Sequence, residues 1–204
     1  MSAPHLWVVA GPNGSGKTTL TGHHFAGRVP VVNPDEIATA INPSHNGDPA
    51  VMLRAGRLAI AERESLLAAR KSFAIETTLT GRSELDLMKR ASAQGYKVSL
   101  IFIGIKDANL SASRVAGRVK NGGHPVPIAD ILRRFDRSLV NLSVALNIAV
   151  RSLVLDNTGK RRRLLLSVDQ GQVKHLAKAL PAWAAKTIPR SVIEAKQNHT
   201  KLSR

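Results

Sequence analysis

The sequence contains no cysteine among its 204 residues. Disulfide bonds, zinc–thiolate sites and thiol nucleophiles are therefore excluded. Aromatic residues are also scarce, with two Trp, one Tyr and four Phe, so few side chains are available for single-stranded bases to stack on. No apolar run approaches the roughly 20 residues of a membrane-spanning helix, and the N-terminus lacks the segments of a signal peptide. We expect a cytoplasmic protein without a membrane partner.

Acidic residues are few as well. Asp and Glu number 14 against 30 Lys and Arg, which gives a formal net charge of +16. Such a charge predicts attraction to polyanions. The scarcity of aromatic residues weakens the nucleic-acid interpretation without excluding it. A substrate that carries several phosphates, or an acidic protein partner, would use the same charge.

The length is that of one domain with a sizeable core. We expect this domain to span residues 1–185. Residues 186–204 are polar and basic without a sustained apolar period, and we interpret them as a tail that is flexible or binds a partner.

A glycine-rich stretch near the N-terminus fits the phosphate-binding pattern G-x-x-x-x-G-K-[ST]. In such a loop, backbone N–H groups surround a phosphate and the following helix adds its positive dipole end. The lysine reaches the outer phosphates of a nucleoside triphosphate, and the hydroxyl after it ligates Mg²⁺. The residues predicted to bind the nucleotide are Gly11, Pro12, Asn13, Gly14, Ser15, Gly16, Lys17, Thr18 and Thr19.

The surroundings of this stretch predict an α/β fold with a P-loop. An apolar run at residues 6–10 suits a buried strand before the loop, and a helix can begin at Thr18. Further strands are expected at residues 28–32, 72–75, 96–105 and 149–155, with an edge strand at 161–168. We predict a parallel sheet of about five to six strands flanked by helices, with residues 96–105 central and a terminal helix from Val173 to about Ala185.

Two further strand ends carry polar residues at the edge of the sheet where α/β proteins bind ligands. At the first, Asn33 is expected to cap a helix, with Pro34 at its first position, and the cap would orient Asp35. At the second, Glu76 and the hydroxyls that follow it could hold sugar hydroxyls. A polar strand end without a ligand remains the alternative for this second group.

Arginines gather on two predicted helices at residues 107–140. Arg114 and Arg118 lie four residues apart on one helix, and Arg134 belongs to the next. The glycines of residues 121–127 form a potential hinge between the helices. This arrangement suits a lid that closes over phosphates, and a solvated helical hairpin is the alternative.

Together these motifs resemble the zeta toxin family of P-loop kinases. The resemblance rests on residues 11–18, 33–35, 76–81, 118–124 and 134–135, and it extends over about residues 6–160. The best-known members of this family transfer the γ-phosphate of a nucleoside triphosphate to a hydroxyl of UDP-N-acetylglucosamine.

The resemblance implies a role for individual residues. Asp35 would be the general base, and Lys17 and Thr18 would hold ATP or GTP with Mg²⁺. Glu76 and Thr78 would contact the substrate. The catalytic lid residues would be Arg118 and Arg134.

The sequence departs from the family at one position. Family members often carry an arginine two residues after the threonine that matches Thr78. Here Thr80 stands at that position, and the nearest arginine is Arg82. Arg82 and Asn33 complete the predicted substrate-binding residues.

The first hypothesis is therefore a kinase of a small hydroxylated acceptor, plausibly a UDP-amino sugar. Two alternatives stay open. One is a nucleic-acid 5′-hydroxyl kinase, which the net charge suggests. The other is a nucleotide-binding toxin or switch that a separate antitoxin protein controls.

Overall fold

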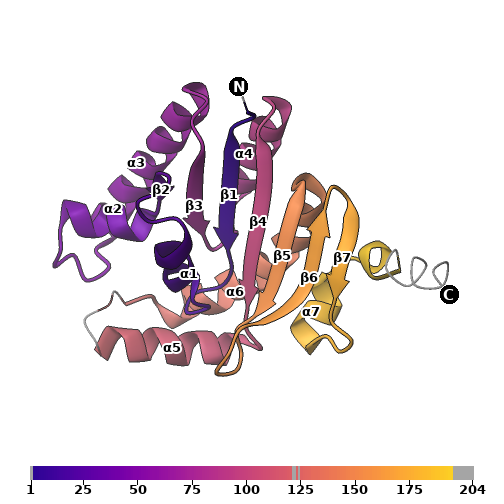
Figure 1. Ribbon diagram of the computed structural model, residues 1–204. Coiled ribbons are helices and arrows are strands. Elements are labelled where there is room, and N and C mark those ends of the chain that lie inside the picture. The colour runs from indigo at the N-terminus through magenta and orange to yellow at the C-terminus, as the bar shows by residue number, and fades with distance from the viewer. Residues whose placement is uncertain (1, 121–122, 124, 195–204) are drawn as a thin grey trace.

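The computed structural model describes residues 2–120, 123 and 125–194. These residues form one seven-stranded sheet with flanking helices (Figure 1). The strands are β1 (His5–Ala10), β2 (Val31–Val32), β3 (Phe73–Thr77), β4 (Lys97–Gly104), β5 (Arg151–Asp156), β6 (Arg163–Asp169) and β7 (Gln172–Leu176). The helices of the described residues are α1 (Lys17–His24), α2 (Pro34–Ile41), α3 (Pro49–Ala68), α4 (Arg82–Ala93), α5 (Ala108–Lys120), α6 (Ile128–Ile148) and α7 (Ala182–Thr187).

The strand order is β2-β3-β1-β4-β5-β6-β7. The first five strands in this order pair in parallel, whereas β6 and β7 are added antiparallel. The predicted α/β class is confirmed, and the long apolar strand β4 lies at the centre, as expected. The sheet has one or two strands more than predicted because the C-terminal region forms a hairpin.

The prediction of a terminal helix from Val173 to about Ala185 is wrong. Gln170 and Gly171 both have positive φ angles, 50° and 73°, which is the backbone of the tight turns that join antiparallel strands. The chain therefore reverses and adds β7 to β6, and a helix forms only at α7.

The packed fold also continues beyond residue 185, where the basic tail was expected to begin. Ile188 is 3% exposed and belongs to the main core, and Val192 and Ile193 pack against that core. The apolar side chains of residues 188–193 therefore pack against the main hydrophobic core and not into solvent. The remainder of the predicted tail, residues 195–204, lies outside the described residues.

Two apolar clusters cover the two faces of the sheet. The larger cluster includes buried side chains of α3, α4, α6 and α7. The smaller cluster takes Leu20 from α1 and Phe25 from its C-cap, and these pack against Val9 and Ile103 of the sheet. Among the described helices, α1 alone contributes to this second face, and Figure 1 shows it in front of the strands.

The carboxyl ends of the parallel strands meet at one edge of the sheet. In register, Val9 lies opposite Glu76 and Ala10 opposite Thr77. The glycine-rich loop after β1 and the loop after β3 therefore emerge side by side, and α5 runs across the same edge (Figure 1). Ligands of α/β sheets bind at such an edge.

The helical hairpin expected as a lid, residues 107–140, is built from α5 and the first part of α6. The second helix is firmly anchored, since Leu142, Ala145 and Leu146 of α6 are buried against the sheet. Residues 121–122 and 124 of the predicted glycine hinge lie outside the described residues, so hinge motion remains a prediction. None of the described helices combines the length and the hydropathy required to cross a membrane.

Candidate functional site

The glycine-rich loop wraps tightly against the sheet. Gly11 has a φ of 144°, and a Cβ atom there would lie 2.1 Å from the carbonyl oxygen of Ile103. Gly16 has a φ of 93°, and a Cβ atom there would lie 2.8 Å from Nδ2 of Asn157. The same Nδ2 donates a 2.8 Å hydrogen bond to the carbonyl of Ser15. Glycine is thus required by both backbone conformation and space.

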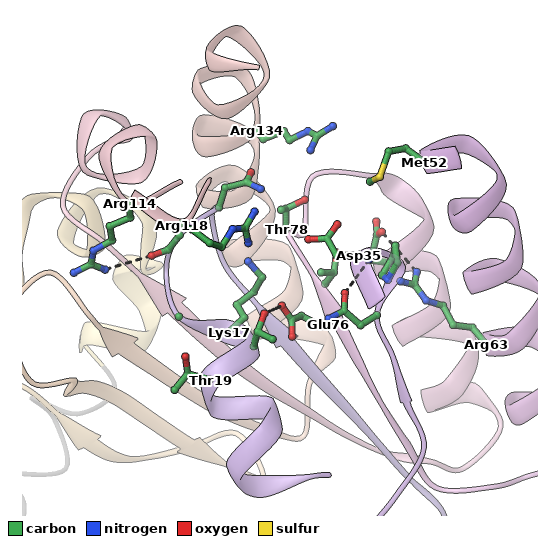
Figure 2. Close-up of a pocket in the computed structure, with 18 residues that line it drawn as sticks. Lys17, Thr19, Asp35, Met52, Arg63, Glu76, Thr78, Arg114, Arg118 and Arg134 are labelled. Carbon is green, nitrogen blue, oxygen red and sulfur yellow. Dashed lines mark hydrogen bonds and ion pairs between the residues drawn. The ribbon is translucent and has the colours of Figure 1, made fainter. Parts of the chain in front are cut away.

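Helix α5 holds the outside of this loop. The Ser111 hydroxyl donates a 2.7 Å hydrogen bond to the carbonyl of Asn13, and Arg114 approaches the carbonyl of Gly14 at 3.4 Å. In Figure 2 the Arg114 side chain turns away from Lys17 and toward the loop. Arg114 thus contacts the loop and, together with Arg118, also lines the cavity described below.

Lys17 is 9% exposed and folds back onto its own loop. Its Nζ donates hydrogen bonds of 3.0 Å to the carbonyls of both Gly11 and Pro12. Burial lowers the pKa of Lys17, and the nearby carboxylates of Glu76 and Asp35 oppose this effect. These two carbonyls accept hydrogen bonds from the ammonium group of Lys17. The oxygens of a bound phosphate could replace them as acceptors.

Glu76, at the end of β3, lies directly beside the loop. Its Oε1 accepts a 2.7 Å hydrogen bond from the Thr18 hydroxyl. Its Oε2 is buried and has no hydrogen-bond partner among the described residues. Burial raises the pKa of Glu76, and the charge of Lys17 offsets this in part. A buried carboxylate oxygen without a partner is costly, and a cation bound at this point would relieve that cost.

The turn between β2 and α2 fixes Asp35 at the same sheet edge. Asn33 is 4% exposed and caps the helix by accepting a 3.1 Å hydrogen bond from the Asp35 backbone N–H. Its Nδ2 donates to Oε1 of Glu36 at 3.1 Å. The amide of Asn33, predicted to bind substrate, is therefore engaged in positioning Asp35, whose own side chain is exposed.

The loop after β3 is held in an unusual conformation. Leu79 is fully buried with a φ of 58°, a region that costs energy for a branched side chain. Its N–H donates to the Thr77 hydroxyl at 2.9 Å, and Asn141 of α6 donates to its carbonyl at 2.9 Å. These bonds define where Thr78 lies, and its hydroxyl is 3.1 Å from that of Thr80.

These elements enclose one cavity of about 390 Å³ at the sheet edge, shown in Figure 2. The predicted site residues that line it are Asn13, Gly14, Gly16, Lys17, Thr18, Thr19, Asn33, Asp35, Glu76, Thr78, Arg118 and Arg134. Gly11, Pro12 and Ser15 shape the loop behind it. Arg82 does not line the cavity and is exposed at the start of α4, so the structure does not bring it to the other site residues.

Arg118 of α5 and Arg134 of α6 reach the cavity from its rim. In Figure 2, Arg118 lies close to Lys17, whereas Arg134 lies farther out, at the end near Met52. Arg134 is also 3.4 Å from Oδ2 of Asp130, one turn earlier in α6. The two helices thus place two guanidinium groups along one side of the cavity.

Three cavity residues were missed by the sequence analysis, namely Met52, Arg63 and Glu84. Arg63 is on α3, a helix whose other arginines, Arg54 and Arg57, are exposed. It is instead 5% exposed, and its guanidinium lies 3.7 Å from Oε1 of Glu84 on α4. Burial lowers the pKa of Arg63, and Glu84 opposes this effect. The sequence around Arg63 does not distinguish it from the exposed arginines of α3, because its burial arises from packing against α4.

The donor types at the loop suit Mg²⁺. This ion prefers oxygen ligands and is usually held by one or two protein groups together with phosphates and water. The Thr18 hydroxyl and the unpartnered Oε2 of Glu76 are oxygen donors of this kind. Within the described ranges, no group of three or more His, Asp or Glu is placed to hold a metal ion.

The fold is that of a P-loop kinase-like protein. A family model described as an AAA domain (AAA_33) matches residues 6–139. The chain therefore belongs to this AAA-domain family. A protein of Haemophilus influenzae (strain Rd), described as uncharacterized, is 36% identical over 127 residues, which span 58% of this chain and 89% of that protein.

Solved structures share the fold at low identity. A chain of the AvrRxo1-ORF1:AvrRxo1-ORF2 complex with sulphate ions superposes with a TM-score of 0.72 at 17% identity, and the match covers 96% of this chain and 71% of that one. A structure of the same complex with ATP gives 0.69 at 18% identity, with 84% and 60% covered. A chain of the PezAT toxin–antitoxin system of Streptococcus pneumoniae gives 0.62 at 16% identity, with 98% and 86% covered. The chain thus spans 60% of the ATP-bound relative's length, and these likenesses concern the fold.

Proposed function

We propose that this protein is a phosphotransferase that moves the γ-phosphate of ATP or GTP to a hydroxyl group of a small molecule. One observation carries this proposal. Lys17 and Thr18 of the phosphate-binding loop line the same cavity as Asp35, which follows β2, a strand separated from β1 by β3. A triphosphate site and a carboxylate that can accept a proton therefore share one cavity.

Each residue has a distinct task in this reaction. Lys17 would leave the carbonyls of its own loop and bind the outer phosphates. Asp35 would accept the proton of the acceptor hydroxyl as its oxygen forms a bond to the γ-phosphorus, while the bond to the β-phosphate oxygen breaks and the nucleoside diphosphate leaves. Phosphoryl transfer depends mainly on positioning and charge neutralisation, and Arg118 and Arg134 would supply positive charge along the cavity.

Mg²⁺ would be held by Thr18 with Glu76 beside it, and when bound it neutralises charge on the phosphates. The Thr18 hydroxyl now donates to Glu76 at 2.7 Å, so the carboxylate orients it. Glu76 would thus support the nucleotide end of the cavity, whereas the family resemblance implied a contact with the substrate.

The acceptor would occupy the end of the cavity lined by Arg63, Glu84, Thr78 and Met52. A guanidinium, a carboxylate and a hydroxyl can recognise an acceptor that carries several hydroxyls and an anionic group. A UDP-amino sugar has both features, and the resemblance to zeta toxins makes it the first acceptor to test. We propose a single domain, with residues 107–140 as a lid over this cavity.

The test is incubation with γ-labelled ATP or GTP, Mg²⁺ and separate acceptors, followed by separation of labelled products. UDP-N-acetylglucosamine, simple sugar acids and a 5′-hydroxyl oligonucleotide form the panel. Transfer to a small hydroxylated acceptor, abolished in Lys17→Met, is the expected result. Labelling of the oligonucleotide with steep salt dependence would instead indicate a nucleic-acid kinase. Tight nucleotide binding without transfer to any acceptor would favour a nucleotide-binding switch.

A further inference from the structure

One face of the sheet is left largely uncovered by the described helices. Parallel strands are usually covered by helices on both faces. Here α3, α4, α6 and α7 contribute to the cluster on one face, whereas the eight-residue α1 serves the other. Figure 1 shows no helix in front of β5 and β6.

The uncovered region forms an apolar groove of about 680 Å³ beside α1. Its floor consists of alternate residues of adjacent parallel strands, with Trp7 from β1, Ile101 from β4, and Leu153 and Leu155 from β5. These four side chains are half-buried. Phe25 forms a wall, and its ring centroid lies 5.5 Å from that of Trp7. The floor is therefore a continuous apolar surface at the place where a helix normally packs on such a sheet.

The charges around the groove have one sign. The ionisable residues that line it are His24, Arg28, Arg151 and Arg162, and no Asp or Glu of the described chain is among its lining residues. Arg151 pairs with Asp169 at 3.4 Å. Arg28 and Arg162 are exposed and have no ion-pair partner within the described part of the chain. The apolar floor thus has a basic border.

This charge selects among the possible occupants. Residues 195–204 carry Lys196, Lys201 and Arg204 and no acidic residue, so the same positive charge would oppose their docking. A second copy of the chain would bring identical arginines together in a protein of net charge +16. An acidic partner would gain from the same field.

We infer that this groove is a docking surface for an acidic amphipathic helix of a partner protein. The apolar side of the helix would cover Trp7, Ile101 and Leu153, and its carboxylates would meet Arg28 and Arg162. The groove shares no lining residue with the nucleotide cavity. The inference therefore does not depend on the proposed phosphotransfer.

Two synthetic 18-residue amphipathic helices test the inference. Both carry leucines on one side, and the other side carries glutamates in the first peptide and lysines in the second. The groove variant is Arg28→Glu/Arg162→Glu. The matched control is Arg54→Glu/Arg57→Glu, which changes the same charge at exposed positions of α3. Circular dichroism, measured for every variant, reports that the variants are folded.

We expect the glutamate peptide to bind the native protein and to shift Trp7 fluorescence, and Trp7→Phe should remove that shift. Charge repulsion should weaken this peptide at least about tenfold in the groove variant and by less than about twofold in the control. The lysine peptide should bind better to the groove variant than to the native protein. Absence of glutamate-peptide binding, equal binding of both peptides, or equal loss in both variants would overturn the inference. Self-association that shields Trp7, measured by sedimentation, would assign the surface to a second copy instead.

Discussion

The hydroxyl of Thr18 donates a 2.7 Å hydrogen bond to Oε1 of Glu76, a residue 58 positions away in the sequence. The contact follows from the pairing of β1 with β3, which places Val9 opposite Glu76. It connects the phosphate-binding loop with the neighbouring strand end. It also leaves Oε2 of Glu76 buried beside Lys17 without a hydrogen-bond partner among the described residues.

Glu76 should make stability depend on pH in a defined direction. Burial raises the pKa of its carboxyl above the usual value, so the folded state binds this proton more tightly than the unfolded state. The stability from this group is present below the unfolded pKa and is lost as the pH rises through the folded pKa. We therefore measure the melting temperatures of the native protein and of Glu76→Gln between pH 4 and pH 8. The melting temperature of Glu76→Gln should rise relative to that of the native protein as the pH increases. Parallel curves for the two proteins would contradict this assignment.

Asp35→Asn should separate binding from transfer. The amide preserves the shape of the side chain but cannot accept the acceptor's proton, so transfer should fall at least about a hundredfold. Triphosphate affinity, measured by calorimetry, should change little. The matched control is Glu36→Gln on the next residue, which keeps an oxygen to accept from Asn33. Full activity in Asp35→Asn would remove this residue from the role of base.

Gly16→Ala should abolish nucleotide binding. A methyl group there would meet Asn157 at 2.8 Å, and the φ of 93° is unfavourable for alanine. Gly22 of α1 is the matched control, since a Cβ atom there has no heavy atom within 4 Å. Gly22→Ala should retain nucleotide affinity and stabilise the helix by about 0.5–1 kcal/mol. Comparable nucleotide affinity in the two variants would show that the loop conformation differs from the one described.

Two ion pairs connect α3 with α4 and should differ in importance. Arg63 and Glu84 are 3.7 Å apart, with side chains 7% and 15% exposed, whereas Glu64 and Arg90 are 2.6 Å apart and nearly half exposed. Glu84→Gln leaves a buried guanidinium unpaired and should cost about 3 kcal/mol. Glu64→Gln at the exposed pair should cost less than about 1 kcal/mol.

Urea denaturation of these variants measures both costs. Replacing both buried partners, Arg63→Met/Glu84→Met, should recover most of the lost stability because no charge then remains buried. A larger loss of stability in Glu64→Gln than in Glu84→Gln would mean that burial does not determine how strongly these ion pairs stabilise the protein.

The backbone of the nucleotide end was predictable from local patterns. Glycine spacing, the apolar runs before Gly11 and Glu76, and the cap at Asn33 each act over a few residues. These patterns indicate strand ends, and strand ends of a parallel sheet meet at one edge. The prediction thus brought Lys17, Asp35 and Glu76 to one edge without knowledge of the packing.

The predictions failed where a neighbouring element decides the outcome. Arg82 was predicted to bind substrate and Arg63 was not, yet the structure buries Arg63 against Glu84 and leaves Arg82 exposed. The helix expected at Val173 became a strand because β6 offered an unpaired edge.

Local sequence determined the phosphate-binding loop, the alternation of strands and helices, and the basic charge, since backbone preference and charge belong to each segment. The packing of the chain decided which arginines are buried, which carboxylate supports Thr18, and which sheet face remains uncovered. These features depend on segments far apart in the chain, and their free energies arise from desolvation and contacts that form only when those segments meet.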